Sequence, residues 1–178
     1  MPQTNAPSGN GWTEKLNDGT LVRIRSINGQ DAELELEFLQ HLSPEFRKAR
    51  FLGMVCDPSP EVARTLTDID PGRAIAFIAL ASYQGRDHQI GAAQFHSNAA
   101  GDNCDASLTV SGDWRKRGVG SLLMRHLIEA ARARGIRHMR AYPSMPSDGG
   151  DNLIARIGFQ RRQDPHDPAT VYYDLPLQ

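Results

Sequence analysis

Apolar and polar positions along this chain predict a central group of strands. Residues 74–82 (AIAFIALAS) form a continuous apolar run that is too short for most helices and suits a strand buried inside a sheet. Residues 89–96 and 105–110 predict two further strands, and the polar segments 84–88 and 99–103 predict the turns between the three. Successive strands joined by short turns indicate an antiparallel meander.

Helical patterns lie on both sides of this meander in the sequence. Within residues 121–134, Leu123 and Leu127 recur at helical spacing, and Gly135 is expected to end that helix. The mixed pattern of residues 30–42 also favours a helix. The remaining predicted elements are a hairpin over 12–27 with an Asp-Gly turn, short helices over 44–50, 60–66 and 151–157, and strands over 138–143, from 159, and over 170–175.

This order of elements predicts an α/β (α+β) fold with a mixed, mostly antiparallel central sheet flanked by helices. Residues 12–178 are expected to form one domain, because their number suits a single full core. Residues 1–11 are rich in Pro, Asn, Gly and Ser, and we expect them to be disordered.

Composition excludes several classes of function. The formal net charge is −1, which gives no general case for nucleic acid or membrane partners. No apolar run has the length of a membrane span, and the first 20 residues lack the apolar core of a signal peptide. Cys56 and Cys104 are isolated, so neither a disulfide framework nor a zinc site is indicated. We therefore expect a cytoplasmic protein that needs no metal.

Ligand chemistry is indicated where a basic, glycine-containing turn opens the long helix. The segment Arg115–Gly120 (RKRGVG) follows the strand that ends at Val110. Its glycines would let the backbone approach a ligand, and the free N–H groups at the positive end of the helix would face an anion. The sequence predicts a diphosphate site, with an ordinary loop-to-helix turn as the alternative.

Arg115-x-x-Gly118-x-Gly120, placed between a strand and a helix, resembles the signature of the GNAT superfamily of N-acetyltransferases. Asp113-Trp114 before it and Gly158-Phe159 after it are similar to further landmarks of that family. The resemblance covers roughly residues 21–175 and implies a GNAT-like domain that uses acetyl-CoA (CoA) as co-substrate. The residues that it implies for CoA binding are Leu108, Thr109, Val110, Arg115, Lys116, Arg117, Gly118, Val119, Gly120, Ser121 and Asn152.

By the same resemblance, the backbone of residues 115–121 would hold the diphosphate, and the strand 108–110 would pair with the amide-bearing arm of CoA. An N–H near Val110 would polarise the thioester carbonyl. The likeness is closer to the acetyltransferase domain of Pat-type bacterial protein lysine acetyltransferases. It rests on Asp18-Gly19-Thr20, residues 22–25 and 42–45, Arg50-Phe51, Ile69-Asp70 and residues 76–79.

The proton-transfer residues follow the family less closely. Asp105 stands where Pat-type enzymes carry a glutamate and is the first candidate for the base, with a solvent-facing acid as the alternative. Glu45 is a weaker candidate with an expected capping role. Ile154 occupies the position of the tyrosine that many members carry, and Ser147 that of an asparagine. Tyr142 is a candidate acid in place of that tyrosine, but core packing is its expected role.

His96 and His126 are expected to be a strand-end residue and a helix-surface residue, respectively. The leading hypothesis is transfer of an acetyl group to a primary amine, either a protein lysine or a small molecule, by a monomer or homodimer. A non-catalytic CoA-binding sensor and an interaction domain without cofactor are the alternatives.

Overall fold

A single eight-stranded sheet organises the described part of the chain, which in this computed structural model comprises residues 11–51, 56–142 and 150–177. The strand order is β1-β2-β3-β4-β5-β6-β8-β7. All neighbours are antiparallel except β5 and β6, which run parallel. The strands are β1 Trp12–Lys15, β2 Leu21–Ser26, β3 Ala74–Tyr83, β4 Arg86–Ser97, β5 Asn103–Val110, β6 His138–Ala141, β7 Gln160–Gln163 and β8 Val171–Pro176.

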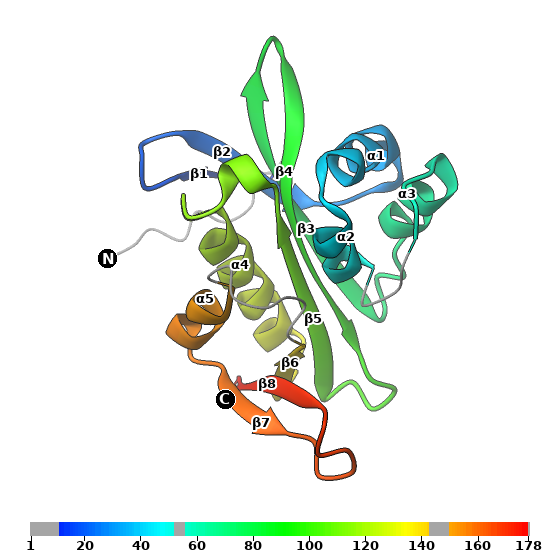
Figure 1. Ribbon diagram of the computed structural model, residues 1–178, viewed down its shortest axis with the longest axis vertical. Coiled ribbons are helices and arrows are strands. Elements are labelled where there is room, and N and C mark those ends of the chain that lie inside the picture. The colour runs from blue at the N-terminus through cyan, green and yellow to red at the C-terminus, as the bar shows by residue number, and fades with distance from the viewer. Residues whose placement is uncertain (1–10, 52–55, 143–149, 178) are drawn as a thin grey trace.

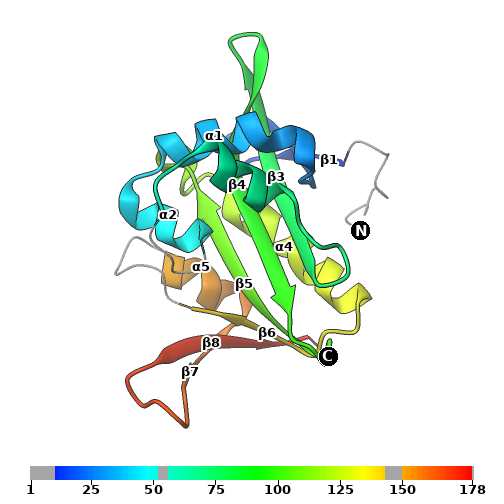
Figure 2. The ribbon, with the colours of Figure 1, turned by 90° about the vertical axis from the view of Figure 1, so that its right-hand side faces the viewer.

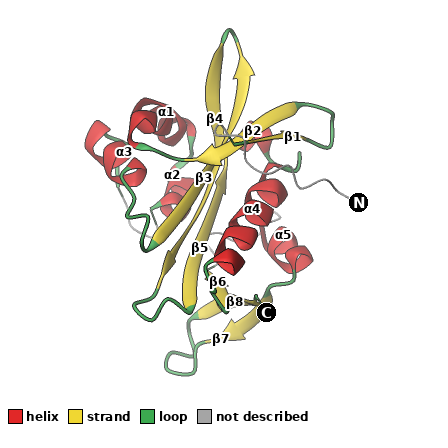
Figure 3. Cartoon of the chain, turned by 180° about the vertical axis from the view of Figure 1, so that it is seen from behind, coloured by secondary structure: helices red, strands yellow, loops and turns green. Residues whose placement is uncertain are grey.

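Helices cover both faces of the sheet (Figures 1 and 3). One face carries α1, α2 and α3, and the other carries α4 and α5. The helices are α1 Ala32–His41, α2 Pro44–Arg50, α3 Pro60–Thr67, α4 Val119–Ala133 and α5 Gly150–Ile157, with short 3-10 turns at Gly29–Asp31 and Gly112–Trp114. The predicted α/β domain and its antiparallel meander, β3-β4-β5, are confirmed.

Two hydrophobic cores lie against the two faces. The core under α4 contains Phe95, Leu123, Leu127 and Met139, all fully buried. The core under the other helices brings residues of α1 and α2 against β3, with Leu39 and Ile78 at its centre. Alternate residues of a strand therefore face different cores, which fixes which side chains of β4 and β5 lie on each face.

The hairpin of β3 and β4 projects beyond the body of the molecule (Figure 1). Its turn has only two residues, Gln84 and Gly85, both with positive φ (52° and 77°), as a tight hairpin requires. The predicted polar turn over 84–88 is present but shorter than expected, because β4 already begins at Arg86. The polar side chain of Arg86 serves a contact with a helix instead, because Arg86 Nη2 donates to Glu37 Oε1 of α1 at 2.8 Å.

His126 is buried, with 5 % of its surface exposed, so the prediction of a helix-surface residue is wrong. The N-terminal hairpin packs over α4 at this point. The imidazole stacks on Trp12 with ring centroids 4.1 Å apart, and its Nε2 lies 2.7 Å from Glu14 Oε1. A pattern confined to α4 does not reveal a neighbour from β1. The expected helix end at Gly135 is confirmed, with φ of 76° just after α4.

Some sequence predictions lie outside the described residues, namely the disorder of residues 1–10 and the end of the predicted strand at Pro143. Within residues 11–51, 56–142 and 150–177, no helix is long and apolar enough to cross a bilayer. The same residues contain no group of three or more side chains arranged to hold a metal ion.

Candidate functional site

The sheet opens between β5 and β6. These strands pair only from Asn103 with His138 to Ala106 with Ala141, whereas β5 continues to Val110. In the described part of the chain, residues 107–110 therefore have a strand neighbour on the β4 side alone. The two strands diverge in Figure 2. The edge of β5 that this split exposes can accept an extended, amide-bearing ligand as if it were another strand.

The backbone of β5 presents polar groups along this open edge. Ser111 N–H donates to Ile90 of β4, whereas the Val110 carbonyl accepts a hydrogen bond from Arg115 Nε at 3.2 Å. Because successive backbone groups of a strand point to opposite sides, the N–H groups of Val110 and Leu108 face the split. This orientation is the one that the predicted carbonyl-polarising role of Val110 requires.

The open edge leads to the N-terminus of α4. Gly118 caps this helix with φ of 102°, and its carbonyl accepts the hydrogen bond from Leu122 N–H. Among the described residues, the N–H groups of residues 119–121 find no acceptor. Their unused donors and the positive end of a 15-residue helix make an environment that favours an anion.

The three basic side chains of this loop have different surroundings. Arg115 lies over the ring of Phe46, 3.2 Å from its centroid. Arg117 stacks on Trp114 and binds Asp18 Oδ2 through Nε at 2.8 Å. Lys116 is exposed and has a φ of 59°. Side chains of Arg115 and Arg117 therefore hold the loop in place, and Lys116 remains the side chain with the freest approach to an anion.

The two glycines of the motif are required for different structural reasons. Gly118 needs its left-handed backbone to start the helix. A Cβ on Gly120 would lie 2.8 Å from Leu153 Cδ2 and 3.2 Å from Leu108 Cδ2, so this glycine lets α4 approach β5 and α5 closely. Sequence reasoning assigned both glycines to ligand approach and could not show this packing role.

Asp18, which holds Arg117, has a pKa lowered from 3.8 to about 2 by hydrogen bonds from Thr20 and then by Arg117. Because the folded-state pKa is depressed, its contribution to stability is fully present above pH 3.8 and is lost as the pH falls towards 2. We expect Asp18→Asn to lower the urea midpoint at pH 6, with a difference from wild type that shrinks steadily between pH 4 and pH 2.5. A difference that stays constant with pH would contradict this.

Charged side chains form a row across four strands on the α1–α3 face. The register places His96 of β4 opposite Asp105 of β5, Asp105 opposite Arg140 of β6, and Arg140 opposite Asp174 of β8. Asp105 is exposed and adjoins the point where β5 and β6 separate. Partial burial raises the pKa of its carboxyl, and electrostatic interactions with Arg140 and then His96 oppose this. Sequence reasoning found Asp105 but missed its partners on the neighbouring strands.

Tyr142 follows β6 directly at this separation and is 49 % exposed, so the expected core-packing role is wrong. Met139 and Ala141 are the residues of β6 that face the core, and alternation turns Arg140 and Tyr142 to the opposite face. Partial burial and then the negative charge of Asp105 raise the pKa of the Tyr142 phenol. A protonated phenol is therefore available beside Asp105.

The remaining candidates lie elsewhere. Glu45 is exposed in the first turn of α2 and accepts a hydrogen bond from Ser43 Oγ at 3.1 Å. Ile154 packs against the core under α4. Asn152 belongs to α5, but its side chain and the whole of Ser147 lie outside the described residues.

A buried polar cluster lies between the helices of the α1–α3 face and the sheet. Arg50 Nε binds Glu35 Oε1 at 2.7 Å, and both side chains are almost fully buried. Gln89 Nε2 donates to Glu35 Oε2 at 2.7 Å, and Arg50 Nη1 donates to Gln94 Oε1. The cluster joins α1 and α2 to β4, and Gln94 lies two residues before His96 on the same face. It thus fixes the helices that border the row of charged side chains.

Comparisons with known proteins agree with one another. Residues 34–159 match the model of the acetyltransferase (GNAT) family. A Pseudomonas aeruginosa protein described as acetyltransferase PA5475 is 34 % identical over 172 residues, which are 97 % of this chain and 92 % of that protein.

Solved structures share the fold. The GNAT domain of S. lividans PAT superposes with a TM-score of 0.76 at 22 % identity, covering 97 % of this chain and 99 % of that domain. A cAMP-binding acyltransferase from Mycobacterium smegmatis gives a TM-score of 0.63 at 18 % identity, with 94 % of this chain but 47 % of that protein covered.

Proposed function

This chain belongs to the acetyltransferase (GNAT) family, and on that premise we propose that it transfers an acetyl group from acetyl-CoA to a primary amine bound on the α1–α3 face of the sheet. It is an N-acetyltransferase of a family that uses acetyl-CoA. The observation that carries the detailed proposal is the open edge of β5 leading to the N-terminus of α4. The proposed binding and proton-transfer steps all take place along that edge.

The donors on this path fit the two polar parts of acetyl-CoA. The N–H groups of residues 119–121 would receive the diphosphate, with Lys116 beside them. Residues 108–110 would hydrogen-bond the amides of the pantetheine arm. The thioester would then lie on the open edge between Val110 and the point where β5 and β6 separate, on the side towards Asp105 and Tyr142.

The chemistry needs a base, because an ammonium has no lone pair. Asp105 is the centre of that base in our proposal. Once the amine has lost a proton, its nitrogen attacks the thioester carbonyl carbon, and Val110 N–H donates to the oxygen that gains charge. The C–S bond then breaks. CoA leaves as a thiolate, and the second proton lost by nitrogen neutralises it, either directly or through the Tyr142 phenol.

For the acceptor, we propose a lysine side chain of a protein. The sequence likeness to Pat-type protein lysine acetyltransferases supports this choice, and the face around Asp105 is exposed rather than enclosed. A small-molecule amine is the alternative. Turnover should be measured by release of the CoA thiol with Nα-acetyl-lysine amide, lysine-containing peptides, spermidine and aromatic amines. Acetyl-CoA binding without turnover of any amine would instead favour a non-catalytic sensor.

The diphosphate site can be tested by reversing the charge of Lys116. Lys116→Glu keeps an L side chain at φ of 59° and should therefore leave the loop intact. Because it places a negative charge beside the diphosphate, we expect acetyl-CoA affinity measured by calorimetry to fall roughly tenfold or more at low salt, and less at high salt. Arg161→Glu, on exposed β7, is the matched control and should bind like wild type. Equal affinities of the two variants would place the diphosphate elsewhere.

A further inference from the structure

We propose that His96 is the second member of the catalytic base, and that its imidazole takes the proton of the acceptor amine while Asp105 stabilises the resulting imidazolium. This inference rests on the proposed function, in which Asp105 is the centre of the base. It assigns a role to a residue whose position in the sequence indicated only the end of a strand.

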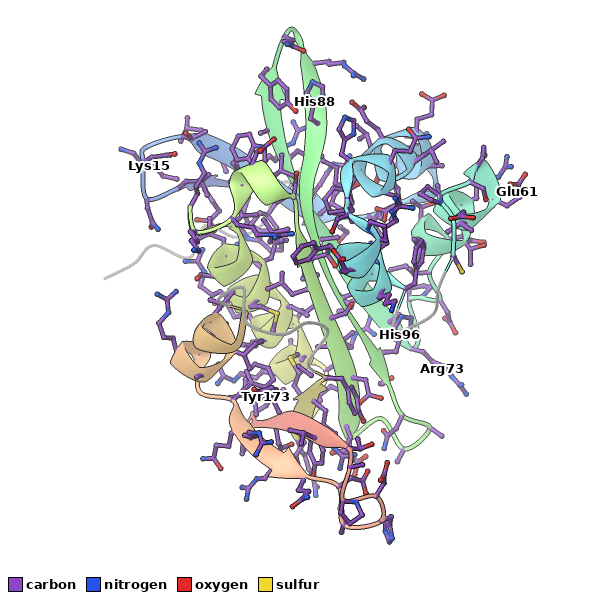
Figure 4. All side chains as sticks on the ribbon, viewed as in Figure 1. Lys15, Glu61, Arg73, His88, His96 and Tyr173 are labelled. Carbon is purple, nitrogen blue, oxygen red and sulfur yellow. The ribbon has the colours of Figure 1, made fainter. Side chains whose placement is uncertain are left out.

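The register of β4 and β5 carries the inference. His96 and Asp105 are direct cross-strand partners, and both are exposed on the face that α1 to α3 border. Directly opposite residues of an antiparallel pair have Cβ atoms about 4.5–5.5 Å apart, which is within reach of an imidazole and a carboxylate. Figure 4 shows His96 on β4 at the opposite end from His88 and towards the loop that carries Arg73.

The turn between the two strands holds this register. Asn98 N–H donates to the Asn103 carbonyl at 2.8 Å, and Asn98 Oδ1 accepts from Asp102 N–H at 3.1 Å. Asn98 Nδ2 also donates to Asp102 Oδ1 at 2.8 Å. A slip of one residue would turn His96 or Asp105 to the other face, and this hydrogen-bonded turn opposes it.

The surroundings of His96 favour a neutral imidazole, which is the form that can accept a proton. Partial burial and then the positive charge of Arg50, on α2, lower the pKa of His96, and the negative charge of Asp105 raises it. Among the described residues, Arg140 of β6 lies opposite Asp105, and the carbonyl of Arg73 accepts a hydrogen bond from Ser97 N–H. A neutral imidazole beside a carboxylate is therefore ready to receive a proton near neutral pH.

The other described histidines have different settings, and His166 is exposed in the segment between β7 and β8. His126 and His88 are buried beside Glu14 and Glu37, respectively. His41 contacts the Glu37 carbonyl of its own helix at 2.7 Å. His138 is exposed and lies 3.2 Å from Asp174, at the end of the β5–β6 pairing that is farther from the point of separation. His138 thus offers a matched control, a histidine beside a carboxylate but away from Asp105.

In the proposed step, one N–H bond of the ammonium breaks and one N–H bond of imidazolium forms. The freed nitrogen lone pair then makes the C–N bond, and the C–S electrons leave with CoA. The proton on His96 returns to water, so each turnover releases one proton to solvent. No oxidant or further reactant is needed.

The test compares His96→Gln with His138→Gln in thiol-release assays, using the amine of the panel that wild type turns over fastest. We expect His96→Gln to lower kcat/KM about 10²-fold, with calorimetric acetyl-CoA affinity unchanged, and His138→Gln to behave like wild type. Wild-type kcat/KM should rise with pH through a group that titrates below an ordinary histidine. This rise of kcat/KM with pH should be absent in His96→Gln.

Histidine titration by NMR provides a measurement that needs no acceptor. Asp105→Asn should lower the pKa of His96 further, because it removes the attraction that raises it. If His96→Gln retains the wild-type rate, or Asp105→Asn does not move His96, this inference is wrong and the proposed function still stands. If wild type binds acetyl-CoA but turns over no amine, the proposed function fails, and the inference with it.

Discussion

Arg50→Met is expected to lower the free energy of unfolding by about 3–5 kcal/mol. The substitution leaves the Glu35 carboxylate buried, with Gln89 as its remaining donor in the cluster, and it removes the donor to Gln94. Removing one partner of a buried ion pair is costly because the other charge remains desolvated. Urea unfolding followed by fluorescence measures the change.

The matched control is Arg64→Met. Arg64 pairs with Glu61 on α3, but their side chains are 64 % and 77 % exposed, so the same substitution should change stability by less than about 0.5 kcal/mol. The double variant Glu35→Leu/Arg50→Met should lose less than the single Arg50→Met, because it leaves no buried charge. Equal stabilities of Arg50→Met and Arg64→Met would mean that the cluster contributes little.

Asp105→Asn is expected to lower kcat by about 10²–10⁴-fold with acetyl-CoA affinity unchanged. The amide has nearly the same shape as the carboxylate, but it has no negative charge with which to assist removal of the amine's proton. Because Asp105 is exposed, the fold should tolerate the change. Thiol release at saturating acetyl-CoA measures the rate, and calorimetry measures the affinity.

Two further variants sharpen this result. Asp105→Glu keeps the carboxylate and should retain far more activity than Asp105→Asn. Asp167→Asn changes an exposed aspartate in the turn between β7 and β8, so it should leave the rate unaltered. Wild-type turnover by Asp105→Asn would remove this residue from the mechanism.

The local part of the fold could be predicted from the sequence, because its patterns are local. The apolar run of β3 and the periodicity of α4 depend on neighbours within one element, and both are confirmed. The predicted turn over 84–88 is too long, because Arg86 is a strand residue whose polar side chain pairs with Glu37 on another element. His126 was misplaced for the same reason, because its partner Glu14 belongs to β1.

The candidate site divides in the same way. The segment from Arg115 to Gly120 carries its own sequence signal, whereas the partners of Asp105 depend on register. His96 could have been found by counting outward from the turn that joins β4 and β5, but Arg140 requires the long-range parallel pairing with β6. Tyr142 was assigned to the core, although alternation from Met139 and Ala141 already turns it outward.

The parallel pairing of β5 with β6 also has a consequence for how the chain assembles. Strands β3, β4 and β5 follow one another through short turns, whereas β6 returns to β5 only after the whole of α4. The β5–β6 pairing therefore closes a longer loop than the pairings of β3 with β4 and of β4 with β5, at a larger cost in chain entropy. A molecule that bound in the split and contacted both strands would offset part of that cost and stabilise the pairing.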